Sequence, residues 1–166
     1  MNIGIVGPQC AGKTTLASFI EGTMMKFAAP LYTVNYALKI DKNRAFMQEQ
    51  SDLIKKYFGR DYFIKEFDKV INKMFQTNFI CDDIRYKLEL DHVKAKGWLL
   101  VYIDADEEIR RDRAKSNDLE FLPDHNSEIE IESLRPDCDI YINNTHLSIG
   151  TLAAIARELQ NFKGMK

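Results

Sequence analysis

The segment 7–14 reads GPQCAGKT and matches the pattern G-x-x-x-x-G-K-[ST]. Glycines let a backbone wrap closely around a ligand, so that its N–H groups and the start of a following helix face phosphate oxygens. The lysine of this pattern reaches the β- and γ-phosphates of a nucleotide, and the hydroxyl beside it is a ligand for Mg²⁺. The pattern therefore predicts a phosphate-binding loop for ATP and Mg²⁺. The residues expected to contact the nucleotide are Gly7, Gln9, Cys10, Ala11, Gly12, Lys13, Thr14 and Thr15, with Thr14 also on the metal.

Two acids and an arginine follow a later apolar run. Residues 78–81 are followed by Asp82, Asp83 and, two positions on, Arg85. Ligands of open α/β sheets bind at the carboxyl ends of the strands. A carboxylate there can hold Mg²⁺ or accept a proton from the attacking group, and an arginine can grip a phosphate through two parallel hydrogen bonds. We expect these residues to serve a reaction; the alternative is that an acid here caps the next helix.

Three further arginines, Arg110, Arg111 and Arg113, follow the most apolar run of the chain. Phosphoryl transfer spreads negative charge over the transferred group, and mobile arginines can stabilise that charge. We expect at least one of the three to act in this way. The alternative is an ordinary solvated helix in which Asp106 and Glu107 pair with the arginines four residues later.

The elements that must position these residues alternate along the chain. Apolar runs predict strands at 3–6, 24–28, 78–81, 98–103 and 139–142, with a proline at position 30 ending the second. Helical spacing predicts helices at 13–22, 86–96, 106–115 and 148–162, and two or three helices within 32–74, broken near 58–61. Residues 117–134 are polar and loop-like, with room for a short helix. This alternation predicts an α/β fold with a parallel sheet of about five strands flanked by helices.

Composition sets the outer bounds. The chain has 166 residues with 23 Lys and Arg against 25 Asp and Glu, a net charge of −2. This size predicts one domain, and the near-neutral charge gives little general attraction for nucleic acid or membranes. No run of residues is long and apolar enough to suggest a membrane span. The three cysteines stand far apart and the histidines lack metal-ligand spacing, so a cytosolic protein without a disulfide framework or zinc site is expected.

With these motifs in view, the chain resembles the nucleoside monophosphate kinases among the P-loop proteins, and more narrowly the deoxynucleoside monophosphate kinases of tailed phages. The segments that carry the resemblance are KFAAPL at 26–31, DIRY at 83–86, HNSE at 125–128 and DIYINN at 139–144. The resemblance implies a single P-loop NTPase domain over residues 1–166. It also implies a helical acceptor-binding insertion at about 32–75 and a lid at about 110–134.

The resemblance further implies roles for particular residues. It favours Asp83 over Asp82 as the metal-binding and catalytic acid, beside Lys13 and Arg85. The residues implied to meet the acceptor are Arg44, Arg60 or Arg85 at its phosphate and Tyr62 and Phe63 around its base. Asn143 and Asn144 are implied to lie near the donor adenine.

The activity so implied is transfer of a phosphoryl group from ATP·Mg²⁺ to a deoxynucleoside monophosphate, in the cytoplasm of a phage-infected bacterium. Its partner would be a small-molecule nucleotide, with the oligomeric state open and a homodimer included. One alternative keeps the machinery but acts on a hydroxymethylated pyrimidine, free or in DNA, although the charge of −2 argues against a duplex acceptor. Another is a nucleotide-binding regulatory module without transfer, and a dephospho-coenzyme A kinase is a more distant relative.

Overall fold

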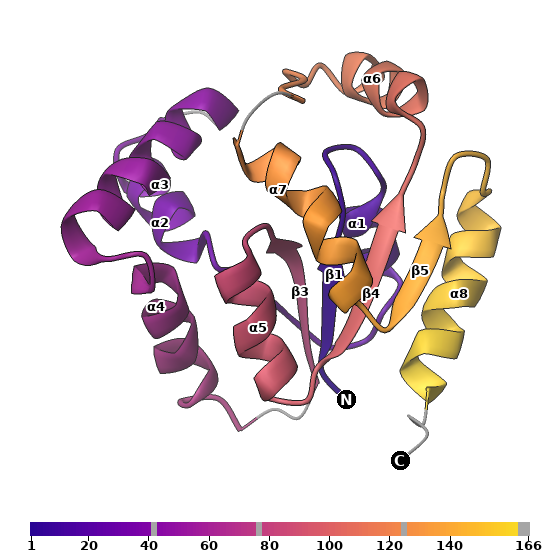
Figure 1. Cartoon of the computed structure of the whole chain (residues 1–166), viewed down its shortest axis with the longest axis horizontal. Helices are drawn as coiled ribbons and strands as arrows, with labels where there is room; N and C mark the ends of the chain where they lie inside the picture. The colour runs from indigo at the N-terminus through magenta and orange to yellow at the C-terminus, as the bar shows by residue number, and fades with distance from the viewer. Residues whose placement is uncertain (41–42, 76–77, 124–125, 163–166) are drawn as a thin grey trace.

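The computed structural model describes residues 1–40, 43–75, 78–123 and 126–162, without the side chains of residues 44, 126 and 127. Within these residues, five strands form one parallel sheet in the order β2-β3-β1-β4-β5, of which β3, β1, β4 and β5 are labelled in Figure 1. They are β1 (Ile3–Val6), β2 (Thr23–Met25), β3 (Phe79–Ile84), β4 (Leu99–Asp104) and β5 (Ile140–Asn143). The predicted α/β fold with a five-stranded parallel sheet is therefore confirmed.

Helices cover both faces of the sheet. They are α1 (Lys13–Ser18), α2 (Ala29–Ala37), α3 (Arg44–Phe58), α4 (Tyr62–Ile71), α5 (Lys87–Ala95), α6 (Glu107–Ser116), α7 (Asn126–Leu134) and α8 (Ile149–Asn161). On one face, α1 and α8 bury Leu16 and Ala156 in a single apolar cluster with the strands. On the other, α5 and α7 pack through Val93 and Ile131 and lie across the near side of the sheet in Figure 1. In the described part of the chain, no helix is both long enough and apolar enough to cross a lipid bilayer.

The helices α2, α3 and α4, hereafter the insertion, lie together at the left of Figure 1, in the stretch where the sequence predicts two or three helices. The break between the last two is Gly59, whose φ of 97° is a conformation that favours glycine. The insertion is fastened to the domain by stacked aromatic rings. The ring centroids of Phe27 and Phe67 lie 4.1 Å apart, and Phe67 packs against Trp98 at 5.9 Å.

Several boundaries differ from the sequence prediction: α1 ends at Ser18 and not near residue 22, and two further differences lie close to the site. Pro30 does not follow a strand but lies in the first turn of α2, where its fixed φ suits a helix and its missing N–H leaves no donor unpaired. Asp82 and Asp83 lie inside β3 rather than after it, because the strand continues to Ile84. The polar stretch 117–134 contains α7, which the fully buried Ile131 and Leu134 anchor in the core.

Candidate active site

The loop between β1 and α1 lies at the carboxyl end of the central strand. The chain extends the sheet to one side of β1 with β2 and β3 and to the other with β4 and β5, so this end is a topological switch point. Both glycines of the motif are needed for the fit. A Cβ on Gly7 would lie 1.9 Å from the carbonyl oxygen of Ile103, and one on Gly12, at φ 106°, would lie 2.4 Å from Nδ2 of Asn144.

Lys13 begins α1 and folds back over its own loop. Its Nζ donates hydrogen bonds to the carbonyl oxygens of Gly7, at 2.5 Å, and Pro8, at 2.7 Å, and the side chain is buried. The ammonium group therefore lies at the inner side of the loop, together with the positive end of the α1 helix dipole. Both favour an anion there.

Asp82 is the acid that meets the phosphate-binding loop. Its Oδ2 accepts a hydrogen bond from Oγ1 of Thr14 at 2.7 Å, and its Oδ1 forms an ion pair with Nζ of Lys26 at 2.5 Å. Burial works to raise the pKa of Asp82, but the hydrogen bonds from Lys26 and Thr14 outweigh it and hold that pKa below its ordinary value. Asp82 is thus a buried, ionised carboxylate beside a threonine hydroxyl, and hard oxygen donors of this kind suit Mg²⁺.

Asp83 has a different set of partners. Its Oδ1 accepts from the backbone N–H of Phe27 and its Oδ2 from that of Ala28, each at 3.0 Å. Burial raises the pKa of Asp83 above its ordinary value, although these donors favour the ionised form. The contacts of Asp83 therefore fasten the turn between β2 and α2, and its hydrogen bonds do not reach Thr14.

Arg85 is linked to the phosphate-binding loop through Glu128 of α7. Its Nη1 forms an ion pair with Oε1 of Glu128, whose Oε2 accepts the backbone N–H of Gln9 at 2.7 Å. The Glu128 side chain is only 3% exposed. Glu128 belongs to the HNSE segment that carries the family resemblance, but no role for it is predicted from the sequence. Its signal was its spacing of three from Ile131, which places the acid on the buried face of α7.

The three arginines of α6 differ in their hydrogen-bond partners. Nη2 of Arg113 donates to the carbonyl oxygen of Asn144 at 2.7 Å, and its Nη1 donates to that of Cys10 at 3.3 Å. Arg110 donates through Nε to the carbonyl oxygen of Ala105 at 2.9 Å and through Nη1 to that of Gln9 at 3.5 Å.

Arg111 pairs with Glu107 at the surface, at 2.7 Å, as the solvated-helix alternative predicts for that pair. The second predicted pair, Asp106 with Arg110, is not formed among the described contacts. Asp106 instead accepts a hydrogen bond from Oγ1 of Thr145. Arg110 and Arg113 thus touch the phosphate-binding loop, and Arg111 does not.

A cavity of about 800 Å³ runs from this loop to the helical insertion. Its loop end is lined by Gln9, Cys10, Gly12, Lys13, Thr14 and Thr15. Its insertion end is lined by Phe27, Tyr32, Asn43, Gln48, Phe63 and Arg85.

Only some of the residues predicted from the sequence to bind the acceptor or the adenine line this cavity. Phe63 lines it, whereas Tyr62 packs edge-on against Phe63 and Arg60 is exposed, and neither reaches its wall. The side chain of Arg44, like His125, lies outside the described residues. Asn144 also lines the cavity and donates from Nδ2 to the carbonyl oxygen of Ala11 at 2.7 Å; Asn143 is exposed.

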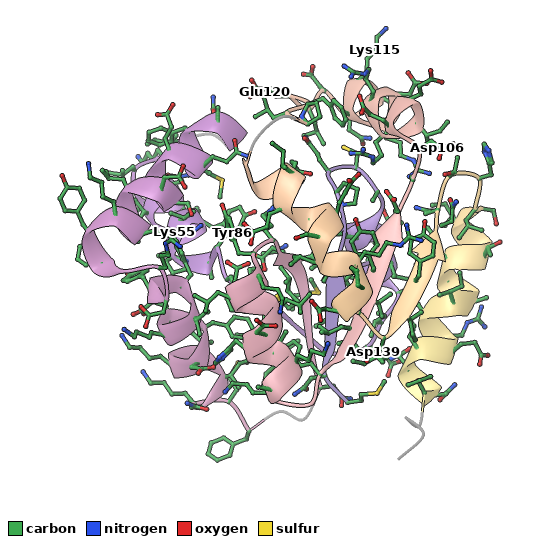
Figure 2. The ribbon with its side chains drawn as sticks, in the orientation of Figure 1. Lys55, Tyr86, Asp106, Lys115, Glu120 and Asp139 are labelled. Atoms are coloured by element: carbon green, nitrogen blue, oxygen red, sulfur yellow. The ribbon has the colours of Figure 1, made fainter. Side chains whose placement is uncertain are left out.

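Glu89, a buried acid, also lines the cavity. Its carboxylate accepts the backbone N–H groups of Arg85, at 2.9 Å, and Tyr86, at 3.2 Å, and so caps α5. Burial raises the pKa of Glu89 to about 7 against the opposing effect of these donors. Lys55 of α3 places its Nζ 3.5 Å from the centroid of the Tyr86 ring (Figure 2). This contact joins the insertion to the start of α5.

The described residues contain no cluster of three or more His, Cys, Asp or Glu side chains able to hold a metal on their own. Mg²⁺ in phosphoryl-transfer enzymes needs no such cluster, because one or two side chains share it with substrate phosphates and water.

Comparison with known proteins places the fold. No protein-family model and no curated protein matches the chain. Shikimate kinase from Aquifex aeolicus vf5 is 18% identical with a TM-score of 0.56, over 99% of this chain and 100% of that one. Shikimate kinase from Acinetobacter baumannii, in complex with shikimate, is 15% identical with a TM-score of 0.55, over 99% and 95%. Deoxyadenosine kinase from M. mycoides, with bound dATP, is 15% identical with a TM-score of 0.52, over 98% and 100%. The chain therefore has the α/β fold of P-loop kinase structures.

Proposed function

We propose that the protein is a kinase that transfers the terminal phosphoryl group of ATP·Mg²⁺ to a deoxynucleoside monophosphate. The observation that carries this proposal is the single cavity that joins the P-loop to a wall of aromatic and amide side chains. A module that only bound ATP would not need the second half of this cavity. The similar structures include kinases of a small acid and of a nucleoside, which supports a small-molecule acceptor.

At the donor end, the P-loop amides and Lys13 would bind the β- and γ-phosphates. We propose Thr14 and Asp82 as the residues that hold Mg²⁺, because they lie within 2.7 Å of each other and supply oxygen donors. This replaces the role that the family resemblance suggested for Asp83. Bound Mg²⁺ would neutralise charge that develops on the phosphates. Lys26 balances the charge of Asp82 in this structure and reaches the same end of the cavity.

At the acceptor end, Arg85 is the cation placed to bind the monophosphate, because its guanidinium lines the cavity between the P-loop and the insertion. The rings of Phe27, Tyr32 and Phe63 offer surfaces on which a base can stack, and the amide of Gln48 can pair with a base edge. The proposed chemistry is positioning and charge stabilisation without a covalent intermediate.

The segment after α6 would exclude water from the reaction. Gln9 of the P-loop donates from Nε2 to the carbonyl oxygen of Glu120 at 2.5 Å and accepts the N–H of Leu122 at 3.0 Å. These two bonds hold the segment over the loop. We propose a lid within residues 110–134 whose far end is fixed by the buried part of α7. Closure would bring Arg110 or Arg113 to the transferred group.

A coupled assay of ADP release tests the proposal. Acceptors to compare are the four deoxynucleoside monophosphates, a hydroxymethylated pyrimidine nucleotide, AMP, shikimate and DNA containing hydroxymethylated pyrimidine. We expect turnover with at least one deoxynucleoside monophosphate and none with shikimate. Resemblance to tailed-phage enzymes further supports a place in the nucleotide metabolism of an infected bacterium. Preference for a hydroxymethylated nucleotide or for DNA would establish the alternative acceptor, and ATP turnover independent of every acceptor would refute a kinase.

A further inference from the structure

Glu128 links Gln9 at the loop end of the cavity to Arg85 at its insertion end. Its carboxylate lies on α7, yet both of its described hydrogen bonds are made to other elements, one to the P-loop and one to the residue after β3. Because Ile131 and Leu134 on the same helix are fully buried, the carboxylate is fixed relative to the sheet. A buried carboxylate is unfavourable unless it is paired and hydrogen-bonded, and here both conditions are met.

The guanidinium of Arg85 is held at one side only. Nη1 binds Glu128, and among the described residues the guanidinium makes no other hydrogen bond. The side chain is 24% exposed and lines the cavity. Since a guanidinium carries five N–H donors in a rigid plane, fixing one nitrogen orients the others, and the cavity is the space left for a bidentate anion.

We propose that Glu128 is a positioning residue for the acceptor phosphate: it fixes the guanidinium of Arg85 and ties it to the P-loop through the N–H of Gln9. This inference rests on the proposed kinase function and extends it to a residue on α7. A free arginine side chain samples many rotamers, so holding Arg85 in advance removes an ordering cost that acceptor binding would otherwise bear. The shared carboxylate also sets the distance between acceptor and donor sites, on which in-line transfer depends.

The test is a double-mutant cycle read as kcat and KM for the acceptor and, separately, for ATP. The variants are Glu128→Ala, Glu128→Gln, Arg85→Ala and the double variant Arg85→Ala with Glu128→Ala. Glu132→Ala is the matched control, an exposed acid on the same helix. Thermal unfolding of each variant checks that it folds, and the isosteric Glu128→Gln keeps an acceptor for one of the two hydrogen bonds.

We expect Glu128→Ala to lower kcat/KM for the acceptor by about 30-fold or more, as removing one partner of a buried charge pair does. The KM for ATP should change much less, Glu128→Gln should recover part of the loss, and Glu132→Ala should match the wild type. In the Arg85→Ala background, loss of Glu128 should add little, because its effect passes through the arginine.

Two results would overturn the inference while leaving the kinase intact. Equal, additive losses in both backgrounds would make Glu128 a structural residue of α7. Tighter nucleotide binding or faster turnover in Glu128→Ala would show that the carboxylate instead competes with phosphate for the P-loop and Arg85. If the wild-type protein transferred phosphate to no acceptor, the proposed function and this inference would both be refuted. That outcome differs from the two results above, in which the wild-type protein remains active.

Discussion

Exchanging one adjacent acid at a time separates a metal-binding role from a structural one. Asp82 binds Thr14 and Lys26, whereas Asp83 binds the backbone of Phe27 and Ala28. We therefore expect Asp82→Asn to abolish most activity in a protein that still folds, and Asp83→Asn to reduce stability first.

The size of each effect follows from these contacts. Asparagine at position 83 keeps one acceptor oxygen but turns an NH₂ group toward the other backbone N–H, which is left without a partner. One unsatisfied buried donor costs about 1–3 kcal/mol, which lowers Tm by several degrees in a domain of this size. At position 82, weakening the grip on Mg²⁺ should reduce kcat by on the order of 10- to 100-fold.

Urea unfolding and the ADP-release assay, run on both variants with the same acceptor, measure the two effects. The assay is repeated at raised Mg²⁺, since weakened metal binding is partly overcome by mass action and a misfolded site is not. An active Asp82→Asn enzyme together with a stable, inactive Asp83→Asn enzyme would refute this reasoning and return the metal to Asp83.

The remaining predictions concern the loop, the buried acid and the lid. Lys13→Met keeps the buried stem but removes the ammonium, so transfer should fall by at least about 100-fold in a folded protein; near-normal turnover would contradict the P-loop assignment. Glu89 has its pKa raised from an ordinary 4.5 to about 7, so the folded protein retains a proton that the unfolded chain releases. The free energy of unfolding should therefore fall by about 3 kcal/mol between pH 4.5 and 7 and then level off. Urea titrations at pH 5 and 8 measure this fall, which the Glu89→Gln variant should not show. Unchanged pH dependence in that variant would show that Glu89 does not titrate in this range. Hydrogen exchange with a dinucleoside pentaphosphate should protect residues 110–123 as well as the P-loop, and protection confined to the P-loop would leave no lid.

Much of the fold was readable from the sequence because its signals are local. The runs 3–6 and 99–103, which form β1 and all of β4 except its last residue, carry no charged side chain, as is typical of strands buried on both faces. The glycine-rich motif identified the loop between β1 and α1 for the same reason, since Gly7 and Gly12 both have a positive φ that other residues rarely adopt. The end of β3 was missed because Asp82 and Asp83 are poor strand formers that tertiary contacts hold in place.

Which of the two acids can bind Mg²⁺ depends on the direction in which each side chain leaves β3, and this direction cannot be read from the sequence. Successive side chains of a strand point to opposite faces, so neighbours in sequence meet different surroundings. Asp82 meets the hydroxyl of Thr14 and the ammonium of Lys26, whereas Asp83 meets the backbone N–H groups of Phe27 and Ala28. A resemblance that aligns the motif by its spacing cannot distinguish these faces, whereas the hydrogen-bond partners do so directly.

The burial of Glu128 could be predicted from the sequence only once residues 126–134 were known to form a helix. Once residues 126–134 are a helix, Glu128, Ile131 and Leu134 follow at intervals of three and share its buried face. An acid on an apolar face is unfavourable without a cationic or N–H partner, so its presence implies one nearby. The partners are Arg85, 43 positions earlier, and the P-loop residue Gln9, 119 positions earlier, separations that no local pattern encodes. Because one carboxylate meets both, its removal should disturb the placement of the acceptor relative to the P-loop, with a much smaller change in the KM for ATP.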